Sequence, residues 1–354
     1  MATQPVQIRS RSTVLAEGAL LLTNDYRRHA VLASVTVLVL GVGLLLQPVA
    51  HVTARPTLDE YVVAEYGAHV LSKITRNGDR AVVYRFEEGT WPRNVAVDPA
   101  GNYVVTELLA DVLSKITSAG LRTVIYQFPR GTIPDGVAID PEGNYIVTES
   151  GVNLLSRINP SGSRTVLYKF SGWTWAASVV VDSEGDYIVA ESGADVLSKI
   201  TPDGKRTILY RFAGGTWPLG VAIDASGNYI VTEYSAHLVS KISPAGVRTV
   251  VHRFMAGTWP AGVAIDSAGN YVVAELLVNV LSKITPTGDR TVICNFAAGT
   301  SPAGVAVAPS RETNAPVGLQ APAERFYALT PYLALVGLGV TAIAVYVIRS
   351  GRRS

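Results

Sequence analysis

Six glutamates recur at a spacing of 42 residues, and each closes a short run rich in Val, Ile and Tyr: Glu65, Glu107, Glu149, Glu191, Glu233 and Glu275. If these carboxylates face a common axis, they form an acidic ring that could bind Mg²⁺, Ca²⁺ or a cationic ligand. Without a cation, such a ring would be repulsive and would raise the pKa of each carboxyl. The alternative is a local role, in which each glutamate accepts hydrogen bonds from its own turn or pairs with the basic residue eight positions on, such as Lys73. Sixfold repetition favours the local role, because a metal site needs only a few ligands.

A second recurring segment reads Gly-Thr-Trp-Pro-x-Gly and places Trp91, Trp175, Trp217 and Trp259 at one register. Tryptophan can stack on a sugar or another flat ligand, or it can wedge between neighbouring structural units. Two positions further on, the copies differ most in charge, and the residues there are Arg93, Asp135, Ala177, Leu219, Ala261 and Ala303.

The third copy departs further, because Trp173 replaces the glycine of this segment and Ala176 replaces its proline. We therefore predict an asymmetric ligand site made of Arg93, Asp135 and the Trp173/Trp175 pair, with Trp91, Trp217 and Trp259 as further candidates. Drift in a redundant array is the alternative explanation.

A third polar register carries two histidines, which could bind a metal but more simply satisfy turns. Its members are His69, Asp111, Asn153, Asp195, His237 and Asn279. No nucleophile–base arrangement, phosphate-binding loop or metal-ligand spacing stands out elsewhere. The sequence therefore predicts no catalytic residue.

These registers belong to a 42-residue unit that runs six times over residues 61–312 without insertion or deletion. Such a period fits either a propeller blade or a pair of helices. Apolar runs of four to seven residues, rich in Val, Ile, Tyr and Thr and separated by Asp, Gly and Pro turns, favour strands. Within one unit we expect strands A to D at Gly220–Asp224, Tyr229–Glu233, Leu238–Ser243 and Arg248–Phe254. The prediction is an all-β, six-bladed propeller with four antiparallel strands per blade.

The phase of the repeat predicts how the ring closes. The first copy begins at strand B and the last ends at strand A, near Gly304–Val307. That last strand must pair with residues 61–86 in a composite blade, which leaves no open edge. Both ends of the propeller then leave from the face of the A–B turns, and the opposite face, built from B–C and D–A loops, is the expected ligand face.

Two apolar segments flank the repeat, at residues 30–50 and 327–348, and each is long enough to cross a bilayer. Arginines next to both spans place the two termini in the cytoplasm and the propeller outside it. The first segment could instead be a cleaved signal peptide. Residues 1–29 and 349–354 would be cytoplasmic, and residues 313–326 a tether. The net charge of +2 argues against a nucleic-acid partner, and a single cysteine excludes an internal disulfide.

The run x-P-x-G-V-A-x-D-x-x-G-N-Y-x-V-T/A-E followed by V-L-S-K-I-T-x-x-G resembles the NHL-type blade, and more closely the virginiamycin B (streptogramin) lyase-like propellers. The resemblance covers residues 61–312. The lyase has seven blades and uses magnesium, a glutamate and histidines that follow the proline of the D–A loop. The matching positions here, which include Arg93 and Asp135, contain no histidine. The resemblance thus implies the fold and withholds the activity.

We therefore expect a membrane-anchored, extracytoplasmic binding or scaffold module that takes a protein, a glycan or a small ligand on its distal loop face. The alternative is a lyase or lactonase of the same fold that depends on a divalent cation. A purely structural surface-layer element is a third reading.

Overall fold

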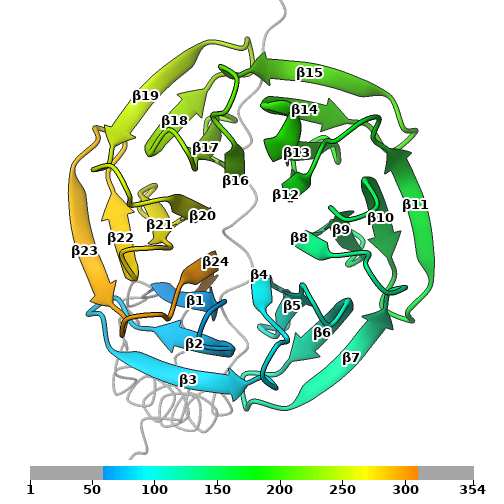
Figure 1. Cartoon of the computed structure of the whole chain (residues 1–354), viewed down its shortest axis with the longest axis horizontal. Helices are drawn as coiled ribbons and strands as arrows, with labels where there is room; N and C mark the ends of the chain where they lie inside the picture. The colour runs from blue at the N-terminus through cyan, green and yellow to red at the C-terminus, as the bar shows by residue number, and fades with distance from the viewer. Residues whose placement is uncertain (1–58, 310–354) are drawn as a thin grey trace, which may run out of the picture. The chain divides into compact units, whose positions relative to one another are not determined.

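Twenty-four strands in six separate four-stranded sheets account for residues 59–309, the part of the chain that this computed structural model describes (Figure 1). Every sheet is antiparallel and stands radially about a central axis. The first strand of each blade lies nearest the axis and the fourth forms the outer rim. The predicted six-bladed, all-β propeller is confirmed.

The blades are numbered here in chain order, and each is given from its inner strand A to its outer strand D. Blade 1 is β24 (Pro302–Pro309), β1 (Asp59–Glu65), β2 (Val70–Ile74) and β3 (Arg80–Arg85); blade 2 is β4 (Pro92–Val97), β5 (Tyr103–Glu107), β6 (Val112–Ile116) and β7 (Arg122–Gln127). Blade 3 is β8 (Pro134–Ile139), β9 (Tyr145–Glu149), β10 (Leu154–Ile158) and β11 (Arg164–Lys169); blade 4 is β12 (Ala176–Val181), β13 (Tyr187–Glu191), β14 (Val196–Ile200) and β15 (Arg206–Arg211). Blade 5 is β16 (Pro218–Ile223), β17 (Tyr229–Glu233), β18 (Leu238–Ile242) and β19 (Arg248–Arg253); blade 6 is β20 (Pro260–Ile265), β21 (Tyr271–Glu275), β22 (Val280–Ile284) and β23 (Arg290–Asn295). One short 3-10 turn, η1 (Ser192–Ala194), follows β13.

Turn chemistry sets the strand ends. In the A–B turn of blade 3, the backbone N–H of Asn144 donates to Asp140 Oδ1 at 2.7 Å, and Gly143 adopts a φ of +82°. Aspartate thus fixes the turn through local hydrogen bonds, and glycine supplies the left-handed conformation. The same Asp-x-x-Gly pattern recurs in the A–B turns of blades 2, 4, 5 and 6, and the strands repeat in length and register accordingly.

The hydrophobic core lies between adjacent blades. One cluster joins Leu155 and Phe170 of blade 3 to Val179 and Tyr187 of blade 4, and all four side chains are buried. Phe170 also meets Tyr168 edge to face, with ring centroids 5.0 Å apart. Because each sheet is covered on both faces by its neighbours, its strands B and C carry buried apolar side chains on both faces.

The ring closes as the repeat phase predicts. Strand β24 pairs with β1 in antiparallel register, so Val305 lies opposite Val63 and Pro309 lies opposite Asp59. The Oδ2 atom of Asp59 also accepts the backbone N–H of Ser267 in blade 6, at 2.8 Å. Both ends of the described chain therefore leave from the face of the A–B turns, and the B–C and D–A loops form the opposite face.

The predicted spans at 30–50 and 327–348, the segments 1–29 and 349–354 and the tether at 313–326 all lie outside the described residues. Within residues 59–309 the structure contains no helix of the length and apolar character that a membrane span requires.

Candidate functional site

Each of the six repeated glutamates is buried and paired with an arginine in its own blade. Arg164 Nε donates to Glu149 Oε1 at 2.7 Å and its Nη2 donates to Oε2 at 2.6 Å. The partner lies fifteen positions on, at the start of strand D, and not at the basic residue eight positions on. The pairs are Glu65–Arg80, Glu107–Arg122, Glu149–Arg164, Glu191–Arg206, Glu233–Arg248 and Glu275–Arg290.

These pairs lie between blades and not around the axis. The Cζ atom of Arg80 is 5.9 Å from the ring centroid of Phe296 in the preceding blade. The inner strands surround a central channel, which opens at the centre of the loop face in what we call the mouth. In the described propeller, none of the six glutamates lines the mouth or the channel. Each carboxylate already has a cationic partner, so the geometry does not support Mg²⁺ or Ca²⁺ binding by these six glutamates. Cation binding by them stays a prediction.

The polar register of the B–C loops holds the D–A loops in place. Asp195 Oδ2 accepts the N–H of Gly215 and Oδ1 accepts that of Trp217, both at 2.7 Å. Asp111 of blade 2 accepts the corresponding N–H groups of Gly131 and Ile133, in the loop that leads into blade 3, and His237 of blade 5 accepts longer bonds of 3.4 Å from the loop that leads into blade 6. These residues satisfy turns, and they let Trp217 adopt its left-handed φ of +54°.

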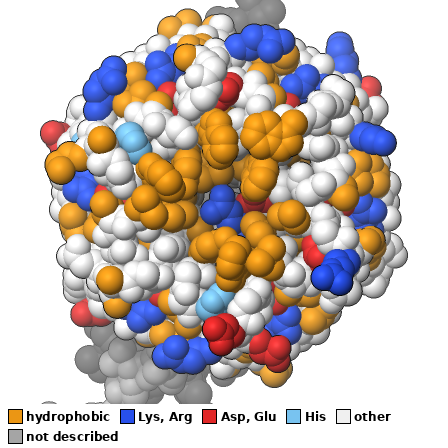
Figure 2. Space-filling model, in the orientation of Figure 1, with side chains coloured by type: hydrophobic (Ala, Val, Ile, Leu, Met, Phe, Trp, Pro, Cys, Tyr) orange, Lys and Arg blue, Asp and Glu red, His pale blue; other side chains and the backbone are white. Residues whose placement is uncertain are grey.

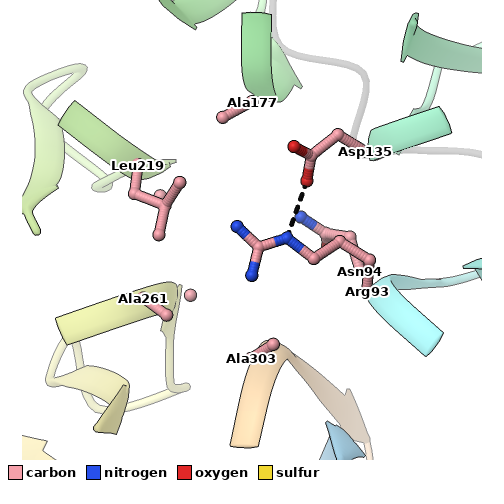
Figure 3. Close-up of a pocket in the computed structure, with 9 residues that line it drawn as sticks. Arg93, Asn94, Asp135, Ala177, Leu219, Ala261 and Ala303 are labelled. Carbon is pink, nitrogen blue, oxygen red and sulfur yellow. Dashed lines mark hydrogen bonds and ion pairs between the residues drawn. The ribbon is translucent and has the colours of Figure 1, made fainter. Parts of the chain in front are cut away.

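Arg93 and Asp135 meet at the centre of the loop face, where the inner strands begin (Figure 3). Arg93 Nε donates to Asp135 Oδ1 at 2.9 Å, and Trp175 Nε1 donates to Asp135 Oδ2 at 3.2 Å. The Asp135 side chain is 1% exposed and that of Arg93 is 15% exposed. Arg93 can cross the mouth because the facing positions carry Ala177, Ala261 and Ala303, whose side chains are short.

Burial dominates the electrostatics of this pair. Desolvation raises the pKa of Asp135 above its ordinary value, and the guanidinium of Arg93 opposes that rise only in part. Desolvation alone would lower the pKa of Arg93, but the charge and hydrogen bond of Asp135 raise it, so Arg93 stays protonated. The mouth therefore keeps a permanent positive group beside a buried carboxyl group.

Beside Arg93 lies an aromatic pocket with a volume of about 140 Å³. Its walls are Trp173, Trp175, Trp217 and Tyr234, and Arg93 forms its inner end. The ring centroid of Trp173 is 6.4 Å from that of Trp175 and 6.1 Å from that of Trp217, in edge-to-face arrangements. Trp173 is 63% exposed. Figure 2 shows hydrophobic side chains gathered around the centre of this face, with a basic side chain among them.

The structure thus brings together Arg93, Asp135, Trp173, Trp175 and Trp217 of the sequence-predicted site. It leaves out two of the predicted tryptophans, which are partly buried against tyrosines: Trp91 lies 4.8 Å from Tyr66, and Trp259 lies 4.9 Å from Tyr234, between ring centroids.

Sequence reasoning missed Tyr234 as a pocket wall and Tyr66 as a neighbour of Arg93. A signal was present at the position after each strand-B glutamate, where four copies carry a large side chain and two carry serine. The residues there are Tyr66, Leu108, Ser150, Ser192, Tyr234 and Leu276.

Two other features carry less chemistry. Below the mouth, the inner strands enclose a cavity of about 400 Å³ with mainly apolar walls, including Val137, Val179 and Val221. On the A–B turns of blade 4, Asp182, Glu184 and Asp186 converge as a metal site would, but Lys199 Nζ lies among them at 3.0, 2.6 and 2.7 Å. The ammonium group therefore takes the place that a cation would need.

No family model matches this sequence, and no curated protein is similar enough to match it. Solved structures do match. A streptogramin B lyase structure shares 16% identity with a TM-score of 0.58, over 69% of this chain and 82% of that one. Virginiamycin B lyase from Staphylococcus aureus shares 18% with a TM-score of 0.56, over 71% and 89%. A chain of a nidogen/laminin complex shares 17% with a TM-score of 0.62, over 71% and 98%.

Likeness at these identities shows the fold. The chain is a β-propeller similar in fold to the virginiamycin B lyases, as its blade motif led us to expect. The fold hosts a lyase in one structure and a protein complex in another, so function has to be argued from the site.

Proposed function

We propose that this protein is a binding propeller that holds a ligand in the aromatic pocket on its loop face. One observation carries the proposal: the sixfold pattern breaks at Arg93, Asp135 and Trp173, and these departures meet, because Arg93 and Trp173 line one partly apolar pocket and Asp135 holds Arg93 in place. Drift in a redundant array would scatter such departures around the ring. A concave apolar site with a few convergent polar groups is the usual form of a ligand pocket.

The pocket's chemistry supports binding over catalysis. Its walls offer indole rings, a phenol, a guanidinium and the hydroxyl of Ser192, which donates to the carbonyl of Pro218 at 2.5 Å. These groups can stack on a ligand and bind an anion, but they make no nucleophile–base pair. The structure within a nidogen/laminin complex is a precedent for this fold in protein assembly.

Membrane anchoring forms part of the same proposal. Two uncharged apolar runs bracket the propeller in the sequence, and arginines flank both. The described chain enters and leaves at the A–B turn face, so tethers from that face would turn the pocket away from the bilayer. The pocket would then face the extracytoplasmic side.

The tryptophans give a direct test, because all five in the chain lie in D–A loops of this face. The full-length protein would be labelled with fluorotryptophan, and its fluorine resonances assigned with single Trp→Phe variants. On titration with p-cresol, a small flat probe, the signals of Trp173, Trp175 and Trp217 should shift. The signal of Trp91, which lies outside the pocket, should stay unchanged. Unmoved pocket signals, or equal shifts at Trp91, would contradict the proposal.

Because the fold is similar to that of two lyase structures, we retain a second candidate function, that of a lyase or lactonase that depends on a divalent cation. A bound cation would raise the thermal unfolding midpoint as its concentration passes its Kd. Titration with Mg²⁺ and Ca²⁺ distinguishes the binding function from the enzyme, and the Glu149→Gln variant tests whether the repeated glutamates bind the ion. An unchanged midpoint with both ions would remove the enzyme candidate.

A further inference from the structure

Arg93 has more hydrogen-bond donors than the described structure uses. A guanidinium carries five N–H groups in a planar fork. Among residues 59–309, Asp135 is the one hydrogen-bond partner of Arg93, and the bond uses Nε alone. The terminal amino groups point away from Asp135, toward Leu219 and Ala261 (Figure 3). Leu219 also lines the aromatic pocket, so these donors face the pocket's inner end.

The rest of the pocket suits one compact apolar group. Its volume of about 140 Å³ is close to that of an apolar cavity known to bind benzene, about 150 Å³. The exposed indole rings of Trp173 and Trp217 form part of its wall and meet each other edge to face, with centroids 6.1 Å apart. A branched aliphatic or phenyl side chain would fit into the pocket against these rings and lose its contact with water.

Charge narrows the choice of ligand. A cationic group would meet the permanent charge of Arg93, and a neutral sugar would find few free polar partners on these walls. A doubly charged phosphate would lie near the carboxylate of Asp135, whose repulsion grows with the ligand's charge. A single carboxylate matches the two terminal amino groups of a guanidinium in shape and can bind them bidentately.

We propose that this pocket recognises an apolar monocarboxylate, with the carboxylate on the terminal nitrogens of Arg93 and the apolar group against the indole rings of Trp173 and Trp217. This assignment rests on the proposed binding function and names its ligand class. The C-terminal residue of a peptide and a small free acid share this chemistry. Asp135 orients the guanidinium through Nε and leaves the other donors for the ligand.

The experiment uses two matched pairs of probes on the fluorotryptophan-labelled, full-length protein. The first pair is N-acetylleucine and its amide, and the second is acetyl-Ala-Ala-Leu with a free or an amidated C-terminus. Each pair differs only in the carboxylate. We expect each acid to bind about tenfold more tightly than its amide, because a bidentate charged hydrogen bond is lost in the amide. A tighter tripeptide acid would assign a peptide terminus, and equal affinity of the two acids would assign a small free acid.

Variants at Arg93 isolate the cause. In Arg93→Gln/Asp135→Asn the pair becomes neutral, so the preference for the acid over the amide should vanish. Arg93→Lys, which keeps the charge without the fork, should reduce the preference, and it serves if the double variant fails to fold. Equal binding of acid and amide by the wild-type protein would overturn this assignment. If p-cresol still shifted the fluorine signals of Trp173 and Trp217, the proposed binding function would stand without the monocarboxylate assignment.

Discussion

Asp135 and Glu149 are both buried carboxylates with an arginine partner, but they engage that arginine differently. Glu149 takes both Nε and Nη2 of Arg164. Asp135 takes only Nε of Arg93, and its second oxygen accepts the indole N–H of Trp175. The first arrangement closes the fork of the arginine, whereas the second leaves it open toward the pocket. The same residue types therefore serve the scaffold in one place and the site in another.

Removing one of the scaffold carboxylates should destabilise the propeller. Glu149→Gln leaves Arg164 beside a neutral amide, and we expect the free energy of unfolding to fall by about 2 kcal/mol. Urea unfolding followed by circular dichroism measures it. Glu184→Gln is the control, because Glu184 is 71% exposed in its ion pair and should change stability by less than about 0.5 kcal/mol. Equal effects of the two substitutions would contradict a structural role for the buried pair.

The pKa of Asp135 predicts a pH dependence with a definite sign. Burial raises this pKa in the folded state, against the opposing effect of Arg93 and the hydrogen bond from Trp175. The folded protein then holds the proton more tightly than the unfolded chain does, so stability is lost as pH rises through the folded-state pKa. The stability of the wild type relative to Asp135→Asn should fall from about pH 4 upward. A difference that grows with pH would show that Arg93 holds the pKa low instead.

At the scale of strands and loops, glycine lets the inner strands approach one another at the axis. A Cβ built on Gly262 of β20 would lie 2.4 Å from the carbonyl oxygen of Ala303 and 3.0 Å from the Cα of Gly304, in the neighbouring blade. Both contacts are backbone, so the clash cannot be relieved by a rotamer change. The glycine of the Pro-x-Gly segment thus sets how closely blades 6 and 1 meet.

Gly262→Ala should therefore cost about 1–3 kcal/mol of unfolding free energy, as overpacking does. Gly214→Ala is the matched control, because nothing lies within 4 Å of a Cβ there and its φ is not in the left-handed region. The control should be neutral or slightly stabilising. Thermal and urea unfolding of both variants would decide, and a neutral Gly262→Ala would refute close packing at the axis.

The loop that carries Trp217 depends on Asp195 for its shape. Asp195→Ala removes both acceptors and leaves alanine at a φ of +52°, so we expect a loss of about 1–2 kcal/mol and a broadened Trp217 fluorine signal. Asp195→Asn should keep most of the stability, because asparagine keeps an acceptor and tolerates this conformation. Asparagine already occupies this register at Asn153 and Asn279. A sharp Trp217 signal in the alanine variant would argue against this control of the pocket wall.

At the scale of the whole propeller, the sequence sufficed for most of the architecture. The repeat length, the turn residues and the phase of the repeat predicted the strands, the blade number and the pairing of β24 with β1. These features are local or periodic, and so one sequence contains them. The direction in which a side chain points is neither local nor periodic, which explains why the arginine partners of the six glutamates were missed.

The candidate site was predicted in part for the same reason. Arg93, Asp135 and Trp173 stand out as breaks in an otherwise regular register, and the structure places them together. Trp91 and Trp259 share their register with Trp217 yet contact Tyr66 and Tyr234. That difference depends on the residue opposite each tryptophan across the loops, which the register alone does not give.

The most direct test of the account is a crystal structure of the protein grown with N-acetylleucine. We predict that the isobutyl group packs against the indole rings of Trp173 and Trp217 and that the carboxylate lies within hydrogen-bond distance of Arg93 Nη1 and Nη2, with the Arg93–Asp135 pair retained. A ligand bound elsewhere on the propeller, with this pocket empty, would contradict the assignment of the loop-face pocket as the binding site.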